Sequence, residues 1–235
     1  MRLVSLTCSN TELVHALGCG DQLVGVDDHS DFPAALVAGL PRVGKDLDVD
    51  ADAVAALCPD LVLASNTVPG HEKVVSRLLA HKQNVLVLAP TSLAHVARDA
   101  RQLGGLLGVP GAGESLARGI ESALSVGPAP TDAPRVLVEW WPRPCIAAGA
   151  RSWVDDMLRC AGARNALSGE DVESRTLEPA EVRALAPDAV VVSWCGVPRA
   201  NYRAARVLER AGWEAVPAVQ NGQVHLISEA YLGRP

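Results

Sequence analysis

The sequence has few aromatic residues and no long apolar run. Phenylalanine occurs once, at Phe32, and aromatic residues make up 3% of the 235 residues. No apolar stretch reaches the roughly 18 residues of a membrane span, so no transmembrane helix is expected. The net charge of −6 argues against a nucleic-acid partner, because such a surface is normally basic. Hydrophobic residues still make up 49% of the chain, which is enough for a buried core.

Motifs of common enzymes are missing as well. The sequence contains no G-x-S-x-G nucleophile elbow, no GxxxxGK[ST] phosphate loop, no G-x-G-x-x-G after a strand and no HExxH zinc motif. The six histidines show no metal-ligand spacing on one helix face. We therefore expect a protein that is not an enzyme and has no metal site of its own.

The six cysteines include no CxxC pair, which favours buried, reduced thiols and a cytoplasmic location. The apolar start at residues 3–6 is too short for a secretory signal and indicates a first strand. Either the protein is cytoplasmic, which Met1 favours, or it is periplasmic or extracellular and an upstream signal has been removed.

Short runs rich in Val and Leu alternate with longer segments of helical periodicity. The runs are almost continuously apolar, as strands buried on both faces are. The predicted strands are residues 3–6, 23–26, 61–64, 85–88, 136–139, 189–193 and 224–227. The predicted helices are residues 11–17, 51–57, 72–81, 93–107, 114–125, 153–161, 179–185 and 200–211. Ser9 is the predicted N-cap of the first helix, and Gly18 its stop. This order predicts an α/β fold with parallel sheets.

An internal repeat indicates two similar halves. Residues 53–65 read AVAALCPDLVLAS and residues 181–193 read EVRALAPDAVVVS, with seven of 13 positions identical. Each copy predicts a helix, a Pro-Asp turn and a buried strand, because proline ends a helix. We predict an N-terminal α/β lobe at 1–90, a stiff helical linker at 91–134 and a C-terminal α/β lobe at 135–235.

Polar and aromatic residues follow the predicted strand ends, where doubly wound sheets bind their ligands. The candidate ligand contacts in the first lobe are Asn10, Thr11, Asp28, His29, Phe32 and Asn66. Those in the second lobe are Trp140, Trp141, Arg143, Arg175, Trp194 and Tyr231. Each has an ordinary alternative: helix capping for the first pair, a solvated turn for the acidic loop, lobe packing for the tryptophans and surface charge for the arginines.

Five ordered segments carry a family resemblance: SNTELVHALGCGDQLVGVDDHSDFP (9–33), DADAVAALCPDLVLAS (50–65), residues 135–167, LEPAEVRALAPDAVVVSWCG (177–196) and residues 216–235. Together they cover nearly the whole chain. The chain resembles the substrate-binding proteins of cobalamin and iron–siderophore ABC importers, called class III or cluster A. Within that family it is most similar to a group without signal peptides.

The resemblance implies two Rossmann-like lobes joined by a long helix, with the ligand in the cleft between them. It implies binding of a bulky metal chelate without catalysis: cobalamin or another corrinoid, a haem-like tetrapyrrole, or a ferric siderophore. His29 stands where cobalamin binders have an aromatic residue, and could stack on a ligand or reach a metal. The resemblance also implies docking on an ABC permease, if the protein is exported, through Asp50 and Glu178.

A second hypothesis from a different class remains open. The same fold could serve a cytoplasmic enzyme or a metal- or cluster-binding protein that uses Cys8, Cys195 or His29. A third is a cytoplasmic scaffold or sensor with a vestigial cleft.

Overall fold

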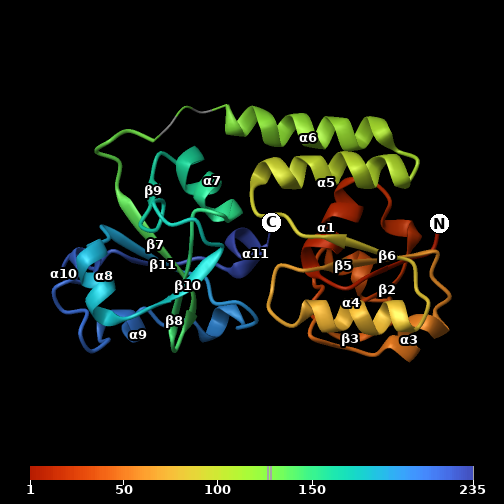
Figure 1. Ribbon diagram of the computed structural model, residues 1–235, viewed down its shortest axis with the longest axis horizontal. Coiled ribbons are helices and arrows are strands. Elements are labelled where there is room, and N and C mark those ends of the chain that lie inside the picture. The colour runs from red at the N-terminus through yellow and green to blue at the C-terminus, as the bar shows by residue number, and fades with distance from the viewer. Residues whose placement is uncertain (126, 128, 235) are drawn as a thin grey trace. The chain divides into compact units, whose positions relative to one another are not determined.

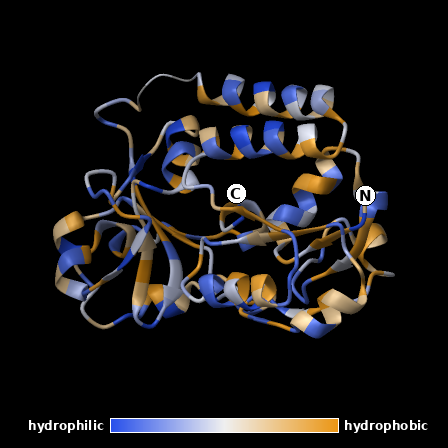
Figure 2. Ribbon diagram, turned by 45° about the vertical axis from the view of Figure 1, so that its right-hand side comes forward, coloured by the Kyte–Doolittle hydropathy of each residue, from blue (hydrophilic) through white to orange (hydrophobic). Residues whose placement is uncertain are grey.

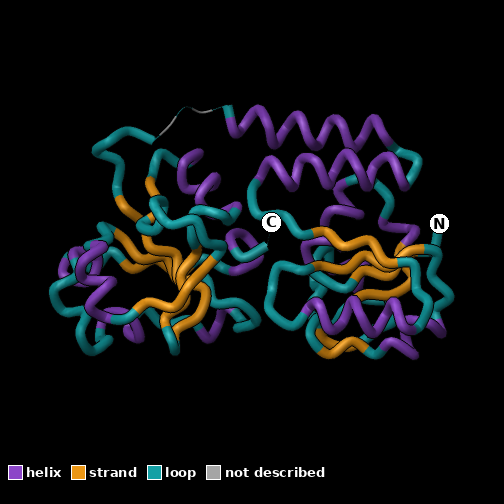
Figure 3. The backbone as a smooth tube through the Cα atoms, in the orientation of Figure 1, coloured by secondary structure: helices purple, strands orange, loops and turns teal. Residues whose placement is uncertain are grey.

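The chain forms two compact units in a computed structural model that describes residues 1–125, 127 and 129–234. Unit 1 comprises residues 1–90 with 95–120, and unit 2 comprises residues 91–94 with 121–235. Most of α5 (Leu93–Leu106) and α6 (Pro110–Leu124) therefore belongs to unit 1, although both helices lie in the segment interpreted as a linker. Figure 3 shows helices and strands alternating within each unit.

Unit 1 is built on a four-stranded parallel sheet in the order β2-β1-β5-β6. The strands are β1 (Leu3–Ser5), β2 (Leu23–Val26), β5 (Leu61–Ser65) and β6 (Val85–Leu88). All four were predicted from their apolar runs. The helices that pack on the sheet include α1 (Cys8–Ala16), α3 (Ala51–Ala56), α4 (His71–Ala80) and α5 (Figure 1).

Both faces of this sheet are buried, which explains why its strands are apolar throughout. Leu3 and Leu63 pack in one cluster with Leu103 of α5. Val4 and Val62 point to the opposite face, in a cluster that includes residues of α3 and α4. The strands accordingly have a hydrophobic colour in Figure 2, whereas the helices carry both colours.

Two glycines allow α5 and α6 to pack unusually closely. The helices run side by side in Figures 1 and 2. A Cβ atom added at Gly104 would lie 2.8 Å from the Cα of Gly113, and one added at Gly113 would lie 2.7 Å from the carbonyl oxygen of Ala100. These are distances at which no side chain fits, so the contact between the two backbones depends on glycine.

Unit 2 has a mixed sheet in the order β10-β8-β7-β11-β12, with β9 also paired to β7. Its parallel strands are β7 (Arg135–Pro142), β9 (Arg164–Asn165), β11 (Ala189–Val192) and β12 (Val224–Leu226). The antiparallel strands β8 (Cys145–Ala148) and β10 (Ser174–Leu177) were not predicted. They escaped prediction because β8 follows β7 through a tight turn at Arg143-Pro144, and because β10 is largely polar.

The helices of unit 2 are α7 (Trp153–Cys160), α8 (Pro179–Leu185), α9 (Ala205–Leu208), α10 (Pro217–Gln220) and α11 (Glu229–Leu232). The helix predicted over 200–211 is wrong, since only a 3-10 turn at Arg199–Asn201 and the short α9 form there. Between them Tyr202 is extended and buried, and its hydroxyl donates to the carbonyl of Trp194 at 2.7 Å. This tertiary contact overrides the helical pattern.

The internal repeat has a structural counterpart in the two units. Asp60 accepts a hydrogen bond from the backbone N–H of Arg2 at 2.6 Å. Asp188, its equivalent in the repeat, accepts one from the N–H of Arg135 at 2.7 Å. Each Pro-Asp turn thus fixes the start of the first strand of its own unit.

The prediction of the first helix start is wrong in detail. Thr7, not Ser9, is the N-cap of α1, and its hydroxyl accepts from the N–H of Asn10. Cys8 and Ser9 lie inside the helix because Thr7 already provides the extended backbone that a cap needs. The stop is confirmed, since Gly18 follows the helix with a φ of 74°.

Candidate functional site

Asn10 and Thr11 connect the loops of unit 1 internally. The Nδ2 of buried Asn10 donates to the carbonyl of Ala64 at 3.1 Å. The hydroxyl of Thr11, fully buried, lies 2.8 Å from the hydroxyls of both Ser5 and Ser30. These bonds tie α1 to β1, to β5 and to the loop after β2. Both side chains are therefore structural, contrary to the prediction that they contact a ligand.

The loop after β2 exposes three of the predicted ligand contacts. Asp28, His29 and Phe32 are exposed, and so is Asn66, which follows β5. The loop is held from below by Asp27, whose carboxylate accepts from the backbone N–H of His29 at 2.9 Å and from a neighbouring serine hydroxyl. Burial raises the pKa of Asp27. The exposed residues of this loop thus lie on a backbone that is fixed by hydrogen bonds.

A carboxylate lies between two imidazoles beside this loop. Asp46 is in the turn between β3 (Gly44–Lys45) and β4 (Asp48–Val49). Its Oδ2 is 3.4 Å from Nε2 of His71, and its Oδ1 is 3.8 Å from Nε2 of His29. The hydrogen bond from His71 lowers the pKa of Asp46, so its carboxylate is charged at neutral pH.

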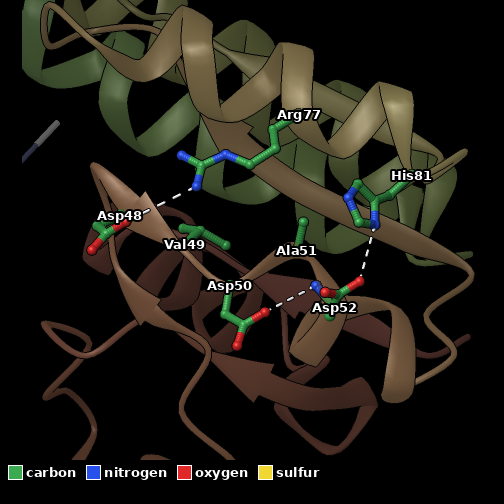
Figure 4. A pocket seen from close by; sticks show the side chains of 7 residues that line it. All are labelled: Asp48, Val49, Asp50, Ala51, Asp52, Arg77 and His81. Atoms are coloured by element: carbon green, nitrogen blue, oxygen red, sulfur yellow. Dashed lines mark hydrogen bonds and ion pairs between the residues drawn. The ribbon is translucent and has the colours of Figure 1, made fainter.

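An acidic hollow of about 350 Å³ opens near the N-terminus of α3 (Figure 4). It is lined by three carboxylates, one guanidinium, one imidazole and two apolar side chains: Asp48, Asp50, Asp52, Arg77, His81, Val49 and Ala51. Arg77 lies 4.0 Å from Asp48, and His81 lies 3.4 Å from Asp52. With three carboxylates against one guanidinium, the hollow favours a cationic partner group.

The two predicted docking residues are both helix N-caps. Asp50 Oδ1 accepts from the backbone N–H groups of Asp52 and Ala53, each at 3.0 Å, at the start of α3. Glu178 caps α8 in a capping box with Glu181, whose carboxylate accepts from the Glu178 N–H at 2.8 Å. Both side chains are exposed, but they also have a structural task.

This double task predicts different results for two substitutions at one position. Asp50→Ala is expected to lower the free energy of unfolding by about 0.5–2 kcal/mol, because the cap is lost. Asp50→Asn keeps a capping oxygen and is expected to change the free energy of unfolding by about 0.3 kcal/mol at most. Urea denaturation followed by far-UV circular dichroism measures both. Equal losses for the two variants would show that the cap does not matter.

In unit 2, Trp194 lies inside the core with 1% of its surface exposed. Its Nε1 donates to Oε1 of Glu139 at 2.8 Å, and Glu139 is itself fully buried. Arg210 pairs with the same carboxylate through both terminal nitrogens, at 2.5 and 2.9 Å. Burial, with Glu139 beside it, raises the pKa of Cys145 to about 12. The predicted stacking role of Trp194 is wrong, because its ring has no exposed face.

The remaining predicted residues of unit 2 differ in accessibility. Trp140 is partly buried against the ring of Trp153 at 5.5 Å. Trp141 is 42% exposed, and its Nε1 donates to the carbonyl of Arg143, itself exposed, at 3.1 Å. Tyr231, in α11, is 74% exposed. Trp141, Arg143 and Tyr231 are therefore accessible to a ligand.

Arg175 already has two anionic partners. Its guanidinium pairs with Glu170 and lies 2.8 Å from Glu181. The hydrogen bond from Arg175 lowers the pKa of Glu170, and the same pair raises the pKa of Arg175. Because two carboxylates neutralise it, Arg175 is a weak candidate for an anionic ligand group, against the prediction.

The hypothesis of a metal- or cluster-binding protein needs several ligating side chains close together. Across residues 1–125, 127 and 129–234, no group of three or more His, Cys, Asp or Glu could hold a metal ion. No disulfide forms among the described cysteines, and only Cys19 and Cys145 are fully buried, so the expectation of buried thiols fails for the other four. Cys8 donates to the carbonyl of His29 at 2.9 Å, and Cys195 is exposed.

No helix among the described residues has the length and hydrophobicity of a membrane-spanning segment.

Sequence reasoning missed several residues that shape these sites. Glu139 left one signal, since it is the only charged residue in the apolar run Val136–Glu139. An acid in a buried strand needs a partner, although its identity, Arg210, is 71 residues away. Asp46 and His71 left no signal, because only the fold brings them to His29.

Two α/β units, each with aromatic or polar side chains exposed after its strands, define the class of two-domain ligand-binding proteins. The chain belongs to the periplasmic binding protein family, whose profile matches residues 3–231. This confirms the resemblance to substrate-binding proteins and the α/β fold.

Individual relatives point to ABC importers. The uncharacterized ABC transporter substrate-binding lipoprotein YvrC of Bacillus subtilis is 28% identical over 95% of this chain and 71% of its own length. The periplasmic heme-binding protein RhuT from Roseiflexus sp. RS-1 is 28% identical, with a TM-score of 0.81 over 98% of this chain and 90% of its own. The periplasmic vitamin B12 binding protein BtuF of Vibrio cholerae is 23% identical, with a TM-score of 0.76 over 100% and 90%, and it shows the shared fold.

Proposed function

We propose that this chain binds a metal tetrapyrrole or a ferric chelate, without converting it, as the substrate-binding component of an ABC importer. The observation that carries the proposal is the exposure of large apolar rings at the predicted ligand positions. Phe32 is 57% exposed in unit 1, and Trp141 and Tyr231 are exposed in unit 2. Tyrosine and tryptophan are enriched where proteins meet partners, and tetrapyrroles present large flat faces to aromatic rings.

The family and the named relatives support this ligand class. Relatives are named for haem and for vitamin B12, both of which are metal tetrapyrroles. The ligand set that we propose comprises Asp28, His29, Phe32, Asn66, Trp140, Trp141, Arg143 and Tyr231. Arg143 adds a guanidinium that can pair with a propionate or phosphate group.

Binding is tested by titrating the purified chain with hemin, cyanocobalamin and a ferric siderophore. All five tryptophans lie in unit 2, so quenching of their fluorescence reports a ligand there. We expect at least one dissociation constant of about 1 μM or below, a binding free energy near −8 kcal/mol. Phe32→Ala and Trp141→Ala are each expected to weaken binding roughly 5- to 100-fold.

The matched control for these variants is Leu208→Ala, which shortens a side chain that is exposed in unit 2 outside the proposed set. It is expected to leave binding unchanged. Dissociation constants of about 1 mM or weaker for all three ligands would contradict the proposal.

We further propose that docking on a permease uses the acidic hollow around Asp50 in unit 1 and Glu178 in unit 2. The excess of carboxylates in the hollow supports an arginine or lysine as the partner group. Because Asp50→Asn keeps the cap, it is the variant to use in a transport assay. Docking on an importer requires the second of the two locations expected from the sequence, outside the cytoplasm, and the cytoplasmic location stays a prediction.

A further inference from the structure

His29, Asp46 and His71 form a connected row of side chains in unit 1. They come from the loop after β2, the β3–β4 turn and the first residue of α4. His71 has 4% of its side chain exposed, whereas His29 has 45% exposed. The row therefore leads from the interior of the unit to its surface, and only its outer imidazole is open to a ligand.

The inner imidazole is joined to Asp46 by a hydrogen bond. Nε2 of His71 lies 3.4 Å from Oδ2 of Asp46, and a carboxylate oxygen is an acceptor. Nδ1 of His71 is buried and has no hydrogen-bond partner among the described residues. His71 therefore positions the Asp46 carboxylate.

The outer imidazole has a carboxylate beside it, with 3.8 Å between Nε2 of His29 and Oδ1 of Asp46. Nε2 of His29 faces Oδ1 of Asp46, and a metal-binding histidine commonly donates its second ring N–H to a carboxylate. The other ring nitrogen, Nδ1, is then the one left for a metal. The backbone of His29 is fixed on both sides, by the carboxylate of Asp27 and by the thiol of Cys8.

The surroundings of His29 favour a metal that brings its own ligands. The part of the chain that the structure describes has no cluster able to hold a bare ion. A tetrapyrrole supplies four ring nitrogens and needs only axial ligands from the protein. Three exposed apolar side chains can take its apolar ring. Phe32 shares the loop of His29, Leu47 follows Asp46 in the β3–β4 turn, and the carbonyl of Val68 accepts from the N–H of His71 at 3.1 Å.

We infer that His29 coordinates the iron of a bound haem through Nδ1, with Asp46 and His71 as positioning residues. The inference rests on the proposed function and narrows it to a tetrapyrrole with an open axial position. Coordination replaces a water or hydroxide on the iron, with no change of oxidation state.

The test compares hemin with metal-free protoporphyrin IX, which has the same ring and no iron. Wild-type protein is expected to bind both and to give the absorption and electron paramagnetic resonance signals of imidazole-ligated ferric iron. His29→Ala is expected to lose these signals and to bind hemin roughly 10- to 100-fold more weakly. Its affinity for protoporphyrin IX is expected to stay unchanged. Added free imidazole is expected to restore the iron signals.

Two further variants separate coordination from structural effects. His15→Ala removes another exposed imidazole of unit 1, whose ring centroid is 6.3 Å from that of Phe32, and is expected to keep the wild-type signals. Asp46→Asn keeps the ligand and removes its anionic partner. It is expected to shift the iron signals and to weaken hemin binding less than His29→Ala does.

The inference and the proposed function fail in different ways. Unchanged iron signals in His29→Ala, or an equal loss of hemin and protoporphyrin affinity, overturn the inference alone. Binding of cobalamin or a ferric siderophore without hemin does the same. If the wild-type chain binds none of these ligands, both fail.

Discussion

Arg210→Met is expected to lower the free energy of unfolding of unit 2 by about 3–5 kcal/mol. The carboxylate of Glu139 is fully buried, and Arg210 is the cation that neutralises it through two short contacts. Without Arg210 the partners of the carboxylate among the described residues are the indole N–H of Trp194 and the thiol of Cys145. A buried charge without its counter-charge is far more costly than a lost surface pair.

Urea denaturation followed by tryptophan fluorescence measures this loss, because every tryptophan is in unit 2. Arg206→Ala is the matched control, since Arg206 is exposed and only stacks over the Trp194 ring, at 5.7 Å. Arg206→Ala is expected to lower the free energy of unfolding by about 1 kcal/mol or less. The double variant Glu139→Gln/Arg210→Met should recover part of the loss, because no ion is left behind. Equal effects of Arg210→Met and Arg206→Ala would contradict the argument.

Gly104→Ala is expected to destabilise unit 1 by about 1–3 kcal/mol. The added methyl group would lie 2.8 Å from the Cα of Gly113 and 3.1 Å from the carbonyl oxygen of Val109. Both are backbone atoms, which cannot rotate away as a side chain can. Relief requires α5 and α6 to separate, and their apolar contacts weaken as they do.

The neighbouring residue provides the same substitution without the contact. A Cβ atom at Gly105 meets nothing within 4 Å, so Gly105→Ala is expected to stabilise α5 by up to about 1 kcal/mol. Far-UV circular dichroism during urea denaturation compares the two, since unit 1 contains no tryptophan. Changes of the same sign for both variants would show that close packing of the helices is not the cause.

Most of the central strands could be predicted because their signal is local. Residues 61–64, 85–88 and 189–193 are apolar runs that need no partner to be recognised, and each forms a strand within one residue of the predicted range. The Pro-Asp turns were equally readable, because proline acts on its immediate neighbours. The mixed character of the second sheet was not, because β8 and β10 are defined by pairing across the sheet.

The candidate residues divide in the same way. From the sequence alone, His29 and Phe32 were placed after a strand end, and both are exposed. Trp141 is exposed as well, but it lies inside β7, which is longer than predicted. The burial of Thr11 and Trp194 becomes visible only in the folded unit. Their residue types suit either a ligand site or a core, and burial depends on neighbours that are far away in the sequence. For the same reason, only the fold could join His29 to Asp46 and His71, and Glu139 to Arg210.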